Sequence, residues 1–389
     1  MTYRVAIVGA GPSGFYAADG LLRTISTDGP DLHIDIIDRL PTPFGLVRAG
    51  VAPDHQGTKA VVRQFDKILA HEGVRFCGNV DVGRDVSWDE LREHCDAVIV
   101  ATGRTIDRKL GVAGEELPHV WGSFRFVAWL NGHPDFRQGP DLAKVRKAAV
   151  IGNGNVAHGV ARLLAKSAGE MAKSDIVPEA GAALAAAPLA AIHVIGRRGP
   201  EHASFTNNEL AEMGRLARAV AVADAMALNV TPPASDPTPE RLRKARNLEI
   251  LRGFAANRPG GKPVTVRFEF NRPMTAIELG EFDLVITCIG YDGEPYPTGD
   301  GMFAVGWARR GPNGTIPTNR ADSHAVARQV MAWLKERNPK SGTDVIPACV
   351  DAAGWHRIDK AEVAAGAAAG RPRVKVVDRD RLLAVAQDD

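Results

Sequence analysis

Two short glycine-rich turns, each set between an apolar run and a helical pattern, constrain the fold of this chain more than any other feature. They occupy residues 9–14 and 152–157, and they follow the apolar residues 4–8 and 148–151. Continuous apolar runs of this length are typical of strands that are buried on both faces of a parallel sheet. The repeat of strand, glycine turn, helix and strand therefore predicts an α/β chain with two Rossmann-like dinucleotide-binding domains.

The first turn has the complete dinucleotide-binding spacing, Gly9-x-Gly11-x-x-Gly14. Gly9 permits the tight turn, Gly11 lets the backbone approach a pyrophosphate, and Gly14 allows the helix to pack closely on the strand. Amide groups at the start of that helix face the phosphate charge. The next strand ends at Asp38, whose carboxylate can accept hydrogen bonds from ribose hydroxyls. This context favours a dinucleotide site over a plain glycine-rich turn.

The second turn reads Gly152-x-Gly154-x-x-Ala157, and the strand after it ends in Arg197-Arg198 instead of an acid. A carboxylate would repel a 2′-phosphate, whereas guanidinium groups bind it bidentately. Roughly 3 kcal/mol of such bonding corresponds to about a hundredfold preference for the phosphorylated cofactor. We therefore predict NADPH in the second unit and FAD in the first. The alternative is a solvated arginine pair at a strand end.

Composition narrows the class of protein further. The chain has 389 residues, enough for two or three domains of roughly 150 residues. Its formal net charge of +2 argues against a nucleic-acid binder that works by bulk charge. The four cysteines form no C-x-x-C motif, so we expect neither a clustered metal site nor an adjacent redox dithiol. With no signal or membrane-spanning pattern, the sequence predicts a cytoplasmic protein.

Apolar periodicity indicates the other elements and suggests a domain boundary near residues 104–106. The pattern predicts helices at 15–23, 59–72, 158–172, 180–191 and 321–336. It predicts further strands at 33–38, 96–102, 192–196, 264–270 and 282–289, and loops at 39–58 and 231–239.

Further motifs occur in order along the chain. They are Pro43-Phe-Gly-Leu-Val-Arg48, Gly50-Val-Ala-Pro-Asp-His55, Gly152-Asn-Gly-Asn-Val-Ala157, Gly196-Arg-Arg-Gly-Pro200, Phe205-Thr206, Glu209-Leu210, Gly306-Trp307, Arg310-Gly-Pro-x-Gly314-Thr-Ile316 and Gly370-Arg-Pro-Arg373. Together they resemble the signature of the adrenodoxin-reductase-like NADPH–ferredoxin reductases. Because the matches extend from residue 5 to about residue 383, the resemblance covers nearly the whole chain.

The resemblance implies an NADP domain, residues 106–298, inserted into a discontinuous FAD domain, residues 1–105 and 299–389. It also implies that NADPH gives a hydride to FAD, from which single electrons pass to a small iron–sulfur ferredoxin. By motif match, the residues in contact with FAD would be Ser13, Asp38, Leu46, Val82, Trp307, Gly314, Thr315 and Ile316. Those facing the NADP pyrophosphate would be Asn153, Gly154, Asn155 and Val156, with Arg197 and Arg198 on the 2′-phosphate.

Two polar residues of these motifs are candidates for the reaction centre. The resemblance implies that His55 helps to hold the nicotinamide or to tune the flavin, and that Glu209 lies on the nicotinamide side. Either could instead be structural, His55 as a loop residue bonded to backbone and Glu209 as an exposed helix acid one turn from Glu212. Neither is expected to be an obligatory acid or base, because hydride transfer to a flavin depends mainly on stacking and proximity. Trp307 could be core packing, but its place before a glycine-rich turn favours a cofactor contact.

Two features depart from the family pattern. The segments 271–281 and 291–303 are shorter than is usual, so the NADP domain is expected to be trimmed, which leaves its outer sheet and domain contacts open. The acid at position 38 is Asp where Glu is commoner, and its shorter reach implies a bridging water or a shifted ribose.

Basic residues are concentrated in one part of the second half of the chain. They are Arg215, Arg218, Arg241, Arg243, Lys244, Arg246 and Arg252. We expect a docking face for an acidic ferredoxin near Arg243 and Lys244, where charge would raise the association rate and salt would lower it. A solvated helix face is the alternative.

Other functional classes fit the sequence less well, and the last two of those that follow remain as alternatives. A pyridine nucleotide–disulfide reductase would need a reactive dithiol, and a flavin monooxygenase would carry its own signature between the two glycine turns; the sequence shows neither. An electron-input subunit of a glutamate-synthase-like complex usually has an N-terminal cysteine cluster. An NADPH-binding regulatory or scaffold flavoprotein would lack NADPH-dependent diaphorase turnover.

Overall fold

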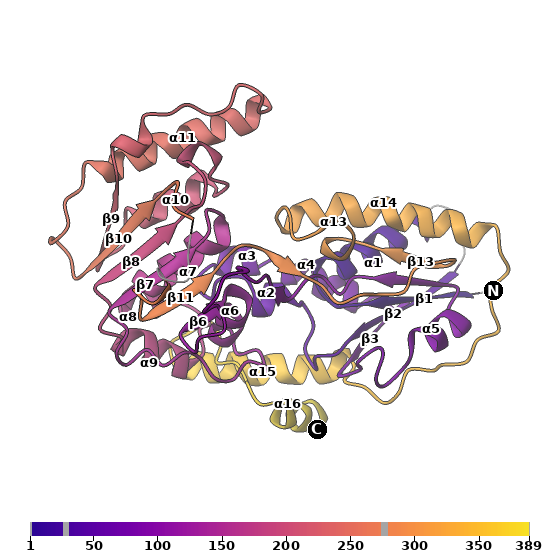
Figure 1. Cartoon of the computed structure of the whole chain (residues 1–389). Helices are drawn as coiled ribbons and strands as arrows, with labels where there is room; N and C mark the ends of the chain where they lie inside the picture. Colours follow the sequence, from indigo (N-terminus) through magenta and orange to yellow (C-terminus); the bar gives the residue numbers. More distant parts are fainter. Residues whose placement is uncertain (1, 26–30, 274–278, 389) are drawn as a thin grey trace.

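The computed structural model describes residues 2–25, 31–273 and 279–388. Two parallel sheets with helices packed around them confirm the predicted α/β class (Figure 1). The first sheet has the order β13-β4-β1-β2-β3. Its strands are β1 (Thr2–Val8), β2 (Asp31–Asp38), β3 (Val74–Gly78), β4 (Ala97–Val100) and β13 (Met302–Ala304). A strand from late in the chain therefore completes a sheet that the first hundred residues begin.

The second sheet has the order β6-β11-β7-β8-β10-β9. Its strands are β6 (Val120–Gly122), β7 (Lys147–Ile151), β8 (Ala191–Ile195), β9 (Ala219–Ala223), β10 (Val264–Glu269) and β11 (Leu284–Thr287). Between the sheets, the short strands β5 (Ile106–Asp107) and β12 (Tyr291–Asp292) pair in antiparallel fashion. This pair lies where the chain leaves the first sheet and where it returns.

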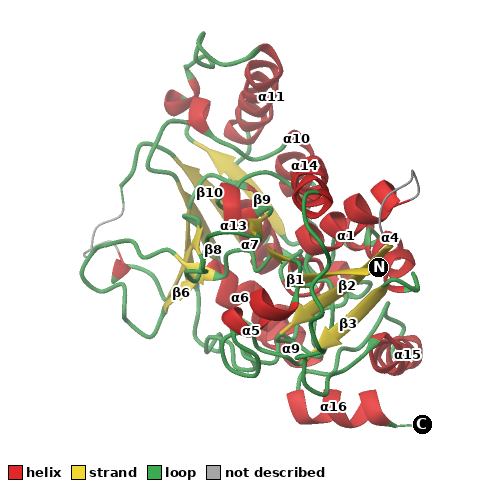
Figure 2. Ribbon diagram, turned by 90° about the vertical axis from the view of Figure 1, so that its right-hand side faces the viewer, coloured by secondary structure: helices red, strands yellow, loops and turns green. Residues whose placement is uncertain are grey.

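Helices pack around both sheets (Figure 2). The helices from the first hundred and the last ninety residues are α1 (Pro12–Ile25), α2 (Leu46–Ala49), α3 (Gln56–Lys59), α4 (Val62–Leu69), α5 (Trp88–His94), α13 (Trp307–Arg310), α14 (Ile316–Lys335), α15 (Ala352–Ala368) and α16 (Arg379–Gln387). Those from the middle of the chain are α6 (Ser123–Leu130), α7 (Asn155–Ala165), α8 (Ala168–Met171), α9 (Pro178–Ala186), α10 (Asn207–Met213) and α11 (Thr238–Ala255). Single 3₁₀ turns occupy 200–202 and 226–228. No described helix has the length and hydropathy that a membrane crossing requires.

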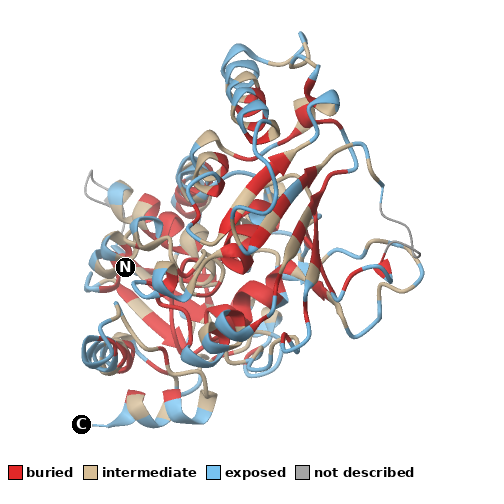
Figure 3. Ribbon diagram, turned by 90° about the vertical axis from the view of Figure 1, so that its left-hand side faces the viewer, coloured by how far each residue is buried: buried red, intermediate tan, exposed pale blue. Residues whose placement is uncertain are grey.

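Buried residues fill the strands and the inner faces of the helices (Figure 3). In the first core, the rings of Phe15 and Phe65 stack with centroids 4.8 Å apart. Phe44, from the proline-rich loop, lies 5.4 Å from Phe15 and 5.4 Å from Trp355 of α15. This aromatic packing holds the loop after β2 beside the first glycine turn.

A buried charged cluster joins the C-terminal segment to elements of both sheets. The ammonium groups of Lys59 and Lys375 lie 2.8 Å and 3.0 Å from the carboxylate of Asp175. Both also donate to Oδ1 of Asn131, at 2.7 Å and 3.0 Å. Burial holds the pKa of Lys375 well below its ordinary value. Because these four side chains come from four separate segments, their bonds hold those segments in one arrangement.

The strand predictions are confirmed to within two residues at each end. The helix predictions are less accurate. The predicted loop 39–58 contains α2 and most of α3, which ends at Lys59. Of the helix predicted at 59–72, residues 62–69 form α4. The helix predicted at 158–172 divides into α7 and α8, because Lys166 is extended and Ser167 forms a capping box that starts a new helix.

Three further differences concern helix ends. The helix in the Ala-rich stretch 180–191 ends at Ala186, as expected from the proline at position 188, but it starts two residues earlier, at Pro178. Helix α14 starts at Ile316, several residues earlier than predicted. The long helix α11 begins at Thr238, within the last residues of the predicted loop. Residues 274–278, in one of the two short segments, lie outside the described residues.

Candidate active site between the two glycine turns

The first glycine turn joins β1 to α1 and has the geometry that its spacing predicts. Gly9 has a φ of 114°, and a Cβ there would lie 2.5 Å from the carbonyl oxygen of Ala101. A Cβ at Gly14 would overlap the carbonyl oxygen of Gly9. A Cβ at Gly11 would meet no protein atom within 4 Å. The turn is therefore closed on its protein sides and open at Gly11, where a pyrophosphate could approach the backbone.

Asp38 lies at the carboxyl end of β2, next to this turn. Its carboxylate accepts hydrogen bonds from the amide groups of Ala10 at 2.8 Å and Leu40 at 2.9 Å. Burial raises the pKa of Asp38, against the lowering effect of these two amides. Asp38 therefore fixes the turn, and its remaining lone pairs are available for a ribose. Val82 lies further along, half-buried against the apolar cluster that contains Ile37.

Residues 306–316 bring a second chain segment to the first turn. The Gly306 amide donates to the Asp322 carboxylate at 2.6 Å, and a Cβ at Gly306 would overlap the hydroxyl of Ser13. The indole of Trp307 donates to the carbonyl of Asn313 at 3.1 Å. Its ring stacks on Tyr291 with centroids 6.0 Å apart, which gives the indole a defined orientation. The Trp307 side chain is nevertheless only half-buried.

Helix α14 starts from this same segment. Gly314, Thr315 and Ile316 form its N-terminus, with Gly314 at a φ of 84° and Thr315 as the N-cap. Gly314 and Thr315 are exposed, and Ile316 and Leu46 pack partly against the buried clusters nearby. Exposed amides at the start of a 20-residue helix favour a negatively charged or electron-rich neighbour.

The second glycine turn joins β7 to α7. A Cβ at Gly152 would overlap the carbonyl oxygen of Cys288, and the side chain of Asn153 covers the backbone of Gly196. Oδ1 of Asn153 is buried and has no hydrogen-bond partner among the described residues. Asn155 accepts from the amide of Thr206 at 2.8 Å. This turn is thus tied to the segment after β8, with one unsatisfied acceptor.

Three residues of this unit present groups to solvent. Val156, at the start of α7, is 38% exposed. Arg197 and Arg198 follow β8, and both side chains are exposed. In the described part of the chain, neither guanidinium has a hydrogen bond or ion pair. Both are free to bind a phosphate.

His55 and Glu209 meet, although they come from different halves of the fold. His55 precedes α3, and its Nδ1 lies 3.6 Å from Oε1 of Glu209 on α10. Its Nε2 lies 3.4 Å from Oε2 of Glu212. Burial raises the pKa of Glu209. The imidazole thus stands between two carboxylates that project from the NADP-side helix.

Basic groups from α7 surround this cluster. Arg162, which is fully buried, pairs with Asp54 and also lies 3.3 Å from Glu212. Arg162 and Lys166 hold the pKa of Asp54 at about 2. The ligand atoms of His55, Glu209 and Glu212 lie within 4.8 Å of one another, a spacing that a divalent cation could use. The Arg162 guanidinium opposes a further positive charge at that place.

Several of these contacts have no signal in the sequence motifs. The sequence pattern places Arg162 and His158 in a helix and Asp54 beside His55 in a motif, but it does not indicate that they meet. One signal in the sequence could have indicated that His158 and Arg162 share a helix face. Positions 158 and 162 lie one turn apart on the helix that starts at the second glycine turn.

The basic face near Arg243 and Lys244 differs from the prediction. Lys244 is buried, and its ammonium lies 2.7 Å from Asp236 and 3.2 Å from Glu240. Arg243 is half-buried and donates to the carbonyl of Phe205 at 2.7 Å. Neither side chain offers a free charge, because Lys244 pairs with Asp236 and Glu240, and Arg243 lies 3.6 Å from the Glu240 carboxylate. Arg215 and Arg241 remain exposed.

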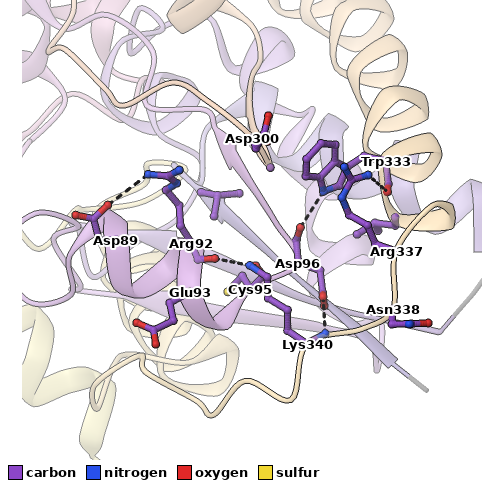
Figure 4. Close-up of a pocket in the computed structure, with 13 residues that line it drawn as sticks. Asp89, Arg92, Glu93, Cys95, Asp96, Asp300, Trp333, Arg337, Asn338 and Lys340 are labelled. Atoms are coloured by element: carbon purple, nitrogen blue, oxygen red, sulfur yellow. Dashed lines mark hydrogen bonds and ion pairs between the residues drawn. The ribbon is translucent and has the colours of Figure 1, made fainter.

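A cavity of about 590 Å³ lies at the other end of the first sheet (Figure 4). It is lined by residues of α5, by the start of β4 and by the C-terminal end of α14, including Trp333. The indole of Trp333 donates to the carbonyl of Asp96, and the Lys340 amide binds the Asp96 carboxylate at 2.8 Å. The cavity is separated from the glycine turn by the length of the strands and is no part of the candidate site.

Comparison with known proteins agrees with this geometry. No protein-family profile matches the chain. NADPH-ferredoxin reductase FprA of Mycobacterium tuberculosis is 35% identical, and the match covers 98% of this chain and 99% of FprA. The mitochondrial NADPH:adrenodoxin oxidoreductase of Arabidopsis thaliana is 32% identical, over 98% of this chain and 95% of that protein.

A solved structure also resembles this chain over its whole length. The structure of M. tuberculosis FprA in complex with NADPH superposes with a TM-score of 0.91 at 34% identity and covers both chains completely. The alignment with FprA spans 460 positions, more than the 389 residues of this chain, so FprA has residues that this chain lacks. From this likeness over nearly the full length, the chain belongs to the NADPH–ferredoxin reductase family of oxidoreductases, to which FprA and adrenodoxin reductase also belong.

Proposed function

We propose that this protein is an FAD-dependent NADPH–ferredoxin oxidoreductase. The observation that carries the proposal is the meeting of His55 with Glu209 and Glu212. His55 follows the first glycine turn in the chain, and both acids follow the second. Two dinucleotide sites whose neighbouring segments touch can place a nicotinamide against a flavin, the arrangement that hydride transfer requires.

The residues present fit both cofactors. The open position at Gly11, the spare lone pairs of Asp38 and the exposed N-terminus of α14 suit the pyrophosphate, ribose and isoalloxazine of FAD. The unsatisfied Oδ1 of Asn153 and the free guanidinium groups of Arg197 and Arg198 suit NADPH. A flavin bound there would accept a hydride and release electrons one at a time.

The chain's own residues then have distinct tasks. Gly11 and Gly154 admit phosphate to helix N-termini, and Asp38 holds a ribose. Trp307, oriented by its stacking on Tyr291, would lie against a bound flavin. We infer that His55 and Glu209 would hold the nicotinamide end of NADPH against the flavin.

We also propose the domain boundaries that the sequence predicts, 1–105 with 299–389 and 106–298. The two sheets support this division, because every strand of the first lies in 2–100 or 302–304. A cytoplasmic location is part of the same proposal, supported by the four free cysteines.

Anaerobic titration of the purified protein with NADPH tests the function. We expect a yellow protein whose visible flavin absorbance bleaches at stoichiometric NADPH and much less readily with NADH. This outcome supports both cofactor assignments at once. A protein that cannot be loaded with FAD, or a flavin that does not respond to NADPH, would contradict the proposal and favour a regulatory or scaffold role.

The electron acceptor is proposed to be a small acidic ferredoxin. The burial of Lys244 moves the proposed docking face to the exposed arginines nearby, Arg215 after α10 and Arg241 on α11. Packing of α10 on α11 supports a common surface for them. Exposed charges of this kind steer an oppositely charged partner and act mainly on the association rate.

Charge reversal of both arginines, Arg215→Glu with Arg241→Glu, tests this face. We expect the KM for ferredoxin in cytochrome c reduction to rise roughly fivefold to tenfold, because each exposed pair contributes up to about 1 kcal/mol. Direct ferricyanide reduction should not change. Arg258→Glu, an exposed arginine before β10, is the matched control. Equal loss in both assays, or none in either, rejects the docking face.

A further inference from the structure

One histidine of the NADP-side helix has no assigned task. His158 lies on α7, four residues after Gly154. Its side chain is fully buried, and neither ring nitrogen has a hydrogen-bond partner among the described residues. The ring lies 6.0 Å from Phe205 and 6.3 Å from Phe268. A buried imidazole without a partner is costly, so its position requires an explanation.

The carboxylate of Glu209 lies close to the ring of His158. Nδ1 of His158 lies 3.9 Å from Oε2 of Glu209, which is also buried and unsatisfied. The other oxygen of the same carboxylate faces His55 at 3.6 Å. Glu209 is thus placed between two imidazoles, and both unsatisfied atoms face one another across a gap slightly longer than a hydrogen bond.

We propose that His158 is a positioning residue: its Nδ1–H donates to Oε2 of Glu209 and holds the other oxygen toward His55 and the nicotinamide. This inference rests on the proposed function for the role of Glu209, but the contact itself does not. A small rotation of the Glu209 side chain closes the gap, as polar contacts in unliganded sites commonly do when ligand binds.

The surroundings of the ring select the tautomer. Phe205 and Phe268 pack near the imidazole, and no acceptor among the described residues is within reach of Nε2. A proton on Nε2 would therefore be a buried donor without a partner, whereas a proton on Nδ1 faces a carboxylate. Burial lowers the pKa of His158 to about 3, so the ring is neutral and donates through one nitrogen only.

The contact also sets the charge state of Glu209. The groups facing this carboxylate are His55 and Asp54 from the segment before α3, Glu212 from α10, and His158 and Arg162 from α7. A hydrogen bond donated to the ionised form lowers the pKa of a carboxyl group. Removing the donor therefore raises the pKa of Glu209, because burial then acts with less opposition.

Nitrogen-15 NMR of histidine-labelled protein tests the contact without any turnover. We expect His158 to show a protonated Nδ1 and an unprotonated Nε2, assigned by the loss of this signal in His158→Asn. In Glu209→Ala the acceptor is gone, and the Nδ1–H form should be lost. The proposal is overturned if His158 carries its proton on Nε2 in the unmodified protein. It is also overturned if the tautomer is the same in Glu209→Ala as in the unmodified protein.

Kinetics test the consequence for the site. His158→Leu removes the donor, whereas the amide nitrogen of His158→Asn can stand where Nδ1 stands. We expect the acid limb of NADPH-dependent flavin reduction to move up by about one pH unit in His158→Leu and to return in His158→Asn. The shift should vanish in the Glu209→Ala background. His193→Asn, at an imidazole 2.5 Å from Glu269 on the same sheet, is the matched control and should leave the limb in place.

The outcomes separate the two hypotheses. Equal damage in His158→Leu and His158→Asn, with the acid limb unmoved, shows a packing role only and overturns the proposal. A confirmed tautomer in a protein that NADPH does not reduce would leave the contact standing and refute the proposed function instead.

Discussion

Replacing Arg197 and Arg198 together with alanine is expected to lower kcat/KM for NADPH about a hundredfold and to leave that for NADH nearly unchanged. The expected loss corresponds to roughly 3 kcal/mol of charge-assisted hydrogen bonds to the 2′-phosphate. Both side chains are exposed, and in the described part of the chain neither has another partner. The substitution therefore removes ligand contacts without removing a contact of the fold.

Steady-state reduction of ferricyanide with each cofactor measures this preference. Single variants should each lose part of the effect, and their sum need not equal the double loss because both bind one phosphate. Arg258→Ala, before the amino end of β10, is the control for loss of one exposed positive charge. An unchanged ratio of NADPH to NADH efficiency in the double variant would mean that this arginine pair is only a solvated strand end.

Alanine at two glycines of the first turn should separate cofactor binding from folding. In Gly11→Ala the new methyl group meets no protein atom within 4 Å, so the fold should be kept. It would project toward the place of the pyrophosphate, where overpacking of about 1–3 kcal/mol weakens FAD binding roughly tenfold to a hundredfold. In Gly14→Ala the methyl group overlaps the carbonyl oxygen of Gly9, so the protein itself should lose stability.

The flavin-to-protein absorbance ratio and the melting temperature of the apoprotein give the two readouts. We expect a reduced flavin content with an unchanged apoprotein Tm for Gly11→Ala, and a lowered Tm for Gly14→Ala. Gly253→Ala on α11 has open space around it and should keep FAD while gaining slightly in stability. Full flavin content in Gly11→Ala would show that the pyrophosphate does not approach this backbone.

Local chemistry explains why the sequence predicted the two turns and the strands beside them. Only glycine tolerates the positive φ at position 9 and the close backbone contact at position 14. The structural role of Gly9 and Gly14 can therefore be predicted from the residue type alone. The buried strand β4 is apolar throughout, and β7 is apolar after Lys147, so the end of each apolar run marks the end of the strand. Motif resemblance then supplied His55 and Glu209, which no local pattern would have brought together.

The remaining features depend on partners far away in sequence or on competition between local signals. Lys244 is in a basic run, but its ammonium group is buried in an ion pair with Asp236 from the preceding loop. The break between α7 and α8 arises because Ser167 caps a new helix where apolar spacing alone would continue the old one. The position of β13 beside β4 is a tertiary result, since three half-buried residues give little periodic signal.

The route of the chain through the two sheets also has a consequence for biosynthesis. A ribosome releases β1 to β4 first, yet the edge of that sheet stays unpaired until β13 emerges some two hundred residues later. Lys375 reaches Asp175 only when almost the whole polypeptide has been made. The second sheet, continuous from β6 to β11, can fold in the meantime. The nascent protein therefore has an exposed strand edge for most of its synthesis, and premature termination after β11 would leave a fragment prone to pair with other chains.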